Sequence, residues 1–129
     1  MLELLGLRTV IYPAPELRAA TNWFTGLLGQ EPYFEELYYV GYNVAGYELA
    51  LDPNADPAVG PRTYWGVSDA DVGLAALLAA GAEPLTAVTD VGDGIRVATV
   101  REPSGSTLGI IENPHFAPSS PTRSDGPGR

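Results

Sequence analysis

The segments "FTGLLGQEP" (residues 24–32) and "LLAAGAEP" (residues 77–84) decide the fold, because each ends an apolar stretch of helical spacing with a glycine. A glycine just past the last apolar residue is the usual C-terminal stop of a helix, and Gly-x-Glu-Pro stands at both places. A β-branched and aromatic strand precedes each helix, "LRTVIYP" at 7–13 and "RTYWGVS" at 62–68. The two halves of the chain therefore begin with the same order of strand and helix.

Extended segments follow each helix and complete a repeat. In the first half they lie within residues 32–53, with a tight connection at Ala45 and Gly46. In the second half they lie within residues 85–113, separated by Asp-Gly and Ser-Gly turns. We therefore predict an α+β fold made of two βαβββ modules. The predicted organisation is one domain at 1–115, with module one at about 7–52 and module two at about 61–114, and a flexible Pro/Ser/Gly-rich tail at 116–129.

The composition excludes several kinds of chemistry. The chain of 129 residues has no cysteine and one histidine, His115, so neither a disulfide nor a zinc site with paired histidines is expected. All seven basic residues are arginine and the formal net charge is −9, which argues against a Schiff-base lysine and against nucleic-acid binding. No apolar stretch approaches the roughly 18 residues that span a bilayer, so we expect a cytoplasmic protein without a membrane partner.

The doubled pattern resembles the glyoxalase/bleomycin-resistance/extradiol-dioxygenase group, the vicinal oxygen chelate superfamily. "FTGLLGQEP" looks like that family's aromatic-x-x-x-Leu-Gly helix end, and "EPSGSTLGIIE" at 102–112 looks like its Asp-Pro-Asp-Gly turn before the last strand. The likeness covers about residues 7–114. It implies that the two modules curve around a shared cleft and that the helices cover the outer faces.

The resemblance also implies where a metal ion would be held. Metal enzymes of this family place one inward-facing ligand on the first and on the last strand of each module, and these positions fall on Thr9, Glu48, Thr63 and Gly109. Only Glu48 has a strong ligand side chain, because a threonine hydroxyl is a weak ligand and glycine offers none. We therefore predict neither a metal ion nor another cofactor.

Alternation along the strands predicts which side chains share the cleft with Glu48. Trp65 is an aromatic residue on that face, and Tyr39 belongs to a group of aromatic residues able to stack on a flat ligand. A carboxylate in such surroundings requires compensation, for which Arg96, Arg101, an ordered water or the ligand's own cation are candidates. The predicted ligand-binding residues are Thr9, Ile11, Tyr39, Glu48, Ala50, Thr63, Trp65, Gly109 and Ile111.

These features favour a metal-free small-molecule-binding protein over a catalyst. The sequence is similar to the bleomycin-resistance branch, whose members are acidic dimers that sequester a cationic, aromatic antibiotic, and this implies a cationic or aromatic ligand and a homodimer. Two enzyme classes stay open: a metal-dependent lyase or dioxygenase of the lactoylglutathione-lyase type, and a metal-free isomerase that uses Glu48 as its base. An interaction module whose cleft is filled by Trp65 and the tyrosines is a further class. His115 is expected at the surface or, alternatively, folded over the mouth of the cleft.

Overall fold

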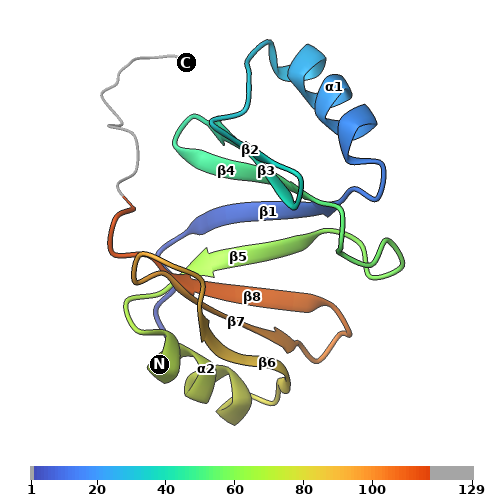
Figure 1. The fold of residues 1–129 in the computed structure, drawn as a ribbon. Helices are drawn as coiled ribbons and strands as arrows, with labels where there is room; N and C mark the ends of the chain where they lie inside the picture. Colours follow the sequence, from blue (N-terminus) through green and yellow to red (C-terminus); the bar gives the residue numbers. More distant parts are fainter. Residues whose placement is uncertain (1, 117–129) are drawn as a thin grey trace.

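A computed structural model describes residues 2–116 and shows two helices flanking a single eight-stranded sheet (Figure 1). The strands are β1 (Leu7–Pro13), β2 (Phe34–Glu36), β3 (Tyr39–Val44), β4 (Tyr47–Asp52), β5 (Arg62–Gly66), β6 (Glu83–Asp90), β7 (Arg96–Arg101) and β8 (Thr107–Glu112). The helices are α1 (Leu17–Leu28) and α2 (Ala70–Ala79). The predicted α+β architecture and the repeat of βαβββ modules are confirmed. The flexible tail predicted at 116–129 lies outside the described residues from position 117 onward.

The order of strands in the sheet is β2-β3-β4-β1-β5-β8-β7-β6, so the two modules lie side by side in it. Within each module the first strand pairs in parallel with the last, β1 with β4 and β5 with β8. The modules join through the antiparallel pair of β1 and β5 at the centre. Figure 1 shows α1 beside the β2–β4 half and α2 beside the β6–β8 half.

Local sequence signals fix the ends of these elements. Gly29 ends α1 in the left-handed conformation, at φ 67°, which costs glycine little. Asp69 caps α2, because its side chain accepts hydrogen bonds from the backbone N–H groups of Asp71 and Val72. The predicted tight connection between β3 and β4 is also present.

Both helices cover the same face of the sheet, which we call the helix face. Leu49 and Leu51 of β4 pack in the α1 cluster, and Leu108 and Ile110 of β8 pack in the α2 cluster. The opposite side, which we call the helix-free face, carries a third cluster. Its buried members are Ile11, Ala50 and Tyr64, with Tyr39, Val97 and Ile111 packed against them.

One strand faces the other way from the prediction. Tyr64, rather than Thr63 or Trp65, lies on the helix-free face, because Tyr64 pairs with Thr9 of β1 and with Gly109 of β8. Thr63 pairs with Leu108 and therefore lies on the helix face. Trp65 alternates with Tyr64 along β5 and shares the helix face with Thr63. The prediction was wrong by one residue on this strand, and a shift of one residue exchanges the two faces of a strand.

Among residues 2–116, no helix is both long enough and apolar enough to cross a membrane.

Candidate functional site

Four residues from the four central strands form a lateral row on the helix-free face. Glu48 of β4 pairs with Thr9 of β1, Thr9 with Tyr64 of β5, and Tyr64 with Gly109 of β8. Neighbours across paired strands share a face and lie within side-chain contact distance. The row therefore brings together Thr9, Glu48 and Gly109, as predicted, with Tyr64 in the place expected for Thr63.

Three hydroxyl groups converge on the Glu48 carboxylate. Thr9 donates from Oγ1 to Oε1 at 3.1 Å, and the Tyr39 hydroxyl donates to the same oxygen at 3.0 Å. The Tyr33 hydroxyl donates a short hydrogen bond to the other oxygen, Oε2. We call Thr9, Tyr33, Tyr39 and Glu48 the carboxylate cluster. It gives a partly buried carboxylate hydrogen-bond donors without adding a compensating charge.

The two arginines considered as candidates to compensate Glu48 lie in other ion pairs. Arg96 bonds to Asp71 at 2.8 Å and to Glu112 at 2.7 Å, at the N-terminal end of α2. Arg101 pairs with Glu83 at 3.4 Å on the outermost strands of the second module. Of the candidates named from the sequence, the two arginines therefore do not compensate Glu48, and uncharged hydroxyl groups on β1, β3 and the segment before β2 reach the carboxylate instead.

Gly41 makes room for the carboxylate cluster. A β-carbon at position 41 would lie 2.8 Å from Oε2 of Glu48 and 3.0 Å from the Tyr33 ring. The backbone N–H of Tyr33 donates to the carbonyl of Gly41 at 2.9 Å, which holds Tyr33 beside β3. Glycine at position 41 of β3 therefore lets Tyr33, from the segment before β2, reach across β3 to Glu48 on β4.

The two tyrosines of the cluster are held in their protonated form. Partial burial of its hydroxyl end, the hydrogen bond to Glu48 and the charge of Glu48 raise the pKa of Tyr33. Burial, followed by the charge of Glu48 and the hydrogen bond to it, raises the pKa of Tyr39 further. A phenolate beside a carboxylate in a low-dielectric site is unfavourable. Both hydroxyls therefore act as stable hydrogen-bond donors.

Tyr64 fills the other half of the row. Its ring lies against Gly109, where a β-carbon would come within 2.5 Å of Cδ2. Tyr64 is 7% exposed, and burial is the main cause that raises the pKa of its hydroxyl. The aromatic ring thus occupies the space that a side chain at position 109 would need.

This donor set does not fit the metal ion that the family resemblance implies. Both oxygens of Glu48 already accept hydroxyl hydrogen bonds, and the rest of the row offers a threonine, a tyrosine and a glycine. Within residues 2–116, no three His, Cys, Asp or Glu residues come together in a group that could hold an ion. Divalent transition metals in proteins require three or four nitrogen, sulfur or carboxylate ligands.

The remaining predicted residues divide between the two faces. Ile11, Ala50 and Ile111 pack with Tyr64 on the helix-free face, whereas Thr63 and Trp65 lie on the helix face. His115 is exposed, and its Nε2 lies 2.8 Å from the carbonyl of Asp93 between β6 and β7.

Sequence reasoning missed Tyr33 and Tyr64 as site residues. Tyr33 lies before β2, where alternation along a strand gives no information on its direction. Tyr64 stands in "RTYWG", where an aromatic residue at either of two adjacent positions fits a half-buried strand equally well. Only the pairing with β1 and β8 distinguishes them.

The architecture and the row of paired positions define the class of fold. Two βαβββ modules in one sheet, with the first and last strands of each module at its centre, form the fold of the glyoxalase/bleomycin-resistance/dioxygenase superfamily. The resemblance inferred from the sequence is confirmed at the level of the fold.

Solved structures support this assignment at low sequence identity. A variant of methylmalonyl-CoA epimerase from Streptomyces coelicolor, in complex with 2-nitronate-propionyl-CoA, has a TM-score of 0.68 and 17% identity over 88% of this chain and 98% of its own. Methylmalonyl-CoA epimerase from Mycobacterium tuberculosis has a TM-score of 0.66 and 19% identity over 86% and 91%. A glyoxalase/bleomycin resistance protein/dioxygenase superfamily member from Vibrio splendidus has a TM-score of 0.62 and 18% identity over 81% and 97%. Neither a family model nor a curated protein sequence matches the chain.

Proposed function

We propose that this chain is a small-molecule-binding protein that holds a cationic or aromatic ligand on the helix-free face, without a metal ion. The observation that carries the proposal is the carboxylate cluster, in which one acid accepts three hydroxyl hydrogen bonds and has no cationic partner within residues 2–116. An ionised carboxylate has about four acceptor sites, so one remains for a ligand N–H group. The hydroxyl groups of the cluster bring no positive charge, so a ligand cation would be the counter-ion of the Glu48 carboxylate.

Aromatic side chains near the cluster supply the apolar part of such a site. Tyr33, 62% exposed, reaches Glu48 through its hydroxyl and leaves its ring open to solvent. Tyr39 contributes from β3, and its ring lies 6.2 Å from that of Phe34. Aromatic faces bind flat ligands and cations with about 0.5 to 2 kcal/mol each. A flat cation therefore fits the chemistry of this surface.

An isomerase with Glu48 as its base is the weaker candidate. Tyr33 and Tyr39 both donate to Glu48 itself, so neither hydroxyl is free to protonate the far side of a substrate. At the opposite end of the row, Gly109 provides no acid. The arrangement therefore supports binding better than two-sided proton transfer.

We also propose that the protein acts as a homodimer that covers the edge near β2. This edge strand and the residues after it expose Phe34, Leu37 and Tyr38, and Leu37 is 91% exposed. Exposed apolar groups on an unpaired strand favour contact with another chain. Light scattering after gel filtration should give the mass of two chains, and Leu37→Glu should give one. Val59→Glu, in the exposed connector, is the matched control; a monomeric wild type would contradict the dimer.

The binding function is tested by titration calorimetry with three ligand types: a flat cation (proflavine), a quinoxaline and bleomycin. At least one is expected to bind, with at least tenfold weaker affinity in Glu48→Gln, which removes the charge and keeps the shape. Glu35→Gln, an exposed acid on β2, should bind like the wild type. The proposal is overturned if none of the three binds, or if Glu48→Gln changes no affinity. Stoichiometric nickel, zinc or iron in protein purified without chelator would contradict the metal-free assignment.

A further inference from the structure

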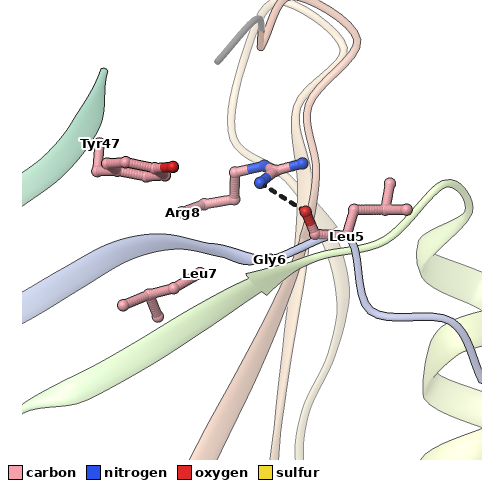
Figure 2. A pocket seen from close by; sticks show the side chains of 5 residues that line it. All are labelled: Leu5, Gly6, Leu7, Arg8 and Tyr47. Atoms are coloured by element: carbon pink, nitrogen blue, oxygen red, sulfur yellow. Dashed lines mark hydrogen bonds between the residues drawn. The ribbon is translucent and has the colours of Figure 1, made fainter. Parts of the chain in front are cut away.

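A second site lies at the N-terminal end of β1, around Arg8. A hollow of about 280 Å³ is lined there by Leu5, Gly6, Leu7, Arg8 and Tyr47, as Figure 2 shows. It shares no lining residue with the carboxylate cluster. Its walls are apolar apart from the Arg8 guanidinium and the Tyr47 hydroxyl.

A bulge in β1 directs Arg8 into this position. Leu7 pairs with Trp65 and Thr9 pairs with the next residue along β5, Tyr64, so Arg8 is one extra residue in the ladder. An extra residue in one strand changes the direction of its side chain relative to the regular alternation. The Arg8 side chain consequently lies across Gly66, where a β-carbon would be 2.8 Å from its Cζ atom.

The guanidinium group packs against two neighbours. It lies against Gly66, and its Cζ atom lies over the Phe116 ring at 3.8 Å from the ring centroid. Nη1 donates to the carbonyl of Leu5 at 3.0 Å, which fixes the orientation of the plane. Guanidinium has five N–H donors in a planar fork, so most of them remain after this single described bond. Figure 2 shows the Tyr47 hydroxyl directed toward the same group.

The charge of Arg8 is unpaired in the part of the chain that the structure describes. Arg62, Arg96 and Arg101 each form an ion pair with a carboxylate. No ion pair of the described residues includes Arg8. This is unexpected in a chain with 16 acidic residues against seven basic ones. A half-buried cation with a preoriented edge and apolar walls is complementary to an anion that brings an apolar body.

We propose that the Arg8 hollow binds a small monocarboxylate with an aromatic or aliphatic body. Two carboxylate oxygens match the guanidinium fork. Phosphate matches the fork too, but the single charge of Arg8 balances a monocarboxylate and only part of the charge of a phosphate dianion. The formal net charge of −9 further disfavours ligands with several negative charges. The volume of about 280 Å³ limits the ligand to a small molecule.

The test is a titration of the full chain with phenylacetate, followed in amide NMR spectra. Saturable shifts are expected at Gly6, Arg8 and Gly66. The affinity for phenylacetate should fall at least tenfold in Arg8→Lys, which keeps the charge but lacks the fork. The wild type should bind the neutral analogue 2-phenylethanol at least tenfold more weakly than it binds phenylacetate. Arg18→Met, on α1, is the matched control and should bind phenylacetate normally.

Three results would overturn the proposal. The first is the absence of saturable shifts, and the second is equal affinity for phenylacetate in Arg8→Lys and the wild type. The third is inorganic phosphate competing at the same concentration as phenylacetate. Glu48→Gln should leave phenylacetate binding unchanged, so a failure of the Arg8 hollow is distinguishable from a failure of the carboxylate cluster. A loss of phenylacetate binding in Glu48→Gln would show that phenylacetate does not bind in the Arg8 hollow.

Discussion

The ring of Tyr64 on β5 lies against the backbone of Gly109 on β8, so closely that a β-carbon at position 109 would be 2.5 Å from the ring. Real β-carbons essentially never make such a contact, and close-packed interiors accommodate added atoms only by moving their neighbours. The Tyr64 ring, together with the Thr63 carbonyl oxygen at 2.9 Å, therefore requires glycine at position 109, within a strand where no turn demands it. The two positions form one packing unit at the centre of the sheet.

Gly109→Ala should reduce the free energy of unfolding by about 1 to 3 kcal/mol, the usual cost of overpacking a core. Urea denaturation measures the change. In a Tyr64→Ala background the same substitution should cost less, although the Thr63 carbonyl oxygen, 2.9 Å from the added β-carbon, still opposes it. Gly26→Ala is the control, since Gly26 lies inside α1 with no neighbour within 4 Å of an added β-carbon. That variant should be stabilised by up to about 1 kcal/mol. An equal cost of Gly109→Ala in both backgrounds would show that Tyr64 is not the obstacle.

Tyr39→Phe should destabilise the fold by about 1 to 3 kcal/mol, because it removes a donor from a partly buried carboxylate. Tyr38→Phe is the matched control. The Tyr38 side chain is 61% exposed and its hydroxyl has no described hydrogen bond within residues 2–116, so a change within about 0.5 kcal/mol is expected. Indistinguishable denaturation midpoints for the two variants would mean that the Tyr39 hydroxyl contributes nothing to stability.

Stability should fall as the pH rises above about 10, where an ordinary tyrosine loses its proton. Burial and the Glu48 carboxylate raise the pKa of Tyr39, so the unfolded chain releases this proton at a lower pH than the folded chain. The corresponding stabilisation is complete below the ordinary pKa and is lost as the pH rises toward the raised one. Free energies of unfolding measured across this range should decline less steeply in Tyr39→Phe than in the wild type. The same slope in both proteins would be the contrary result.

Thr9→Val should weaken binding of whichever cation binds the carboxylate cluster by roughly three- to tenfold, because it removes the hydroxyl that holds Oε1 of Glu48 in place and a hydrogen bond contributes about 1 kcal/mol. Thr63→Val is a matched isosteric control, because Thr63 pairs with Leu108 on the helix face. Calorimetry on both variants separates the two faces of the sheet. A larger effect at Thr63 than at Thr9 would contradict the register of β5.

Asp69→Ala should lower the free energy of unfolding by about 0.5 to 2 kcal/mol through loss of the α2 cap. The Asp69 carboxylate accepts from the backbone of Asp71 at 2.9 Å and of Val72 at 3.1 Å. Ser68→Ala, at the preceding exposed position, should have little effect. Thermal unfolding of the two variants tests whether Asp69 is the cap residue. A greater loss of stability in Ser68→Ala than in Asp69→Ala would show that Ser68 caps the helix instead.

Much of the architecture follows from local signals. The glycines after both helices, the Ala45-Gly46 turn and the cap at Asp69 depend on backbone conformations that these residues favour wherever they occur. The position of Glu48 opposite the helices also follows, because Leu49 and Leu51 beside it must pack under α1. Alternation along one strand is enough to place all three residues.

The facing of β5 and the partners of Glu48 depend on contacts between distant parts of the chain. The sequence alone determined the two modules, their helix ends and the side of the sheet on which Glu48 lies. Tertiary structure decided that Tyr64 rather than Thr63 faces Thr9 and that hydroxyl groups surround the acid. The physical reason is that the direction of a side chain in a strand is set by its register with neighbouring strands, and Tyr64 is fixed by its pairing with Thr9 of β1 and Gly109 of β8, which lie far from it in the sequence.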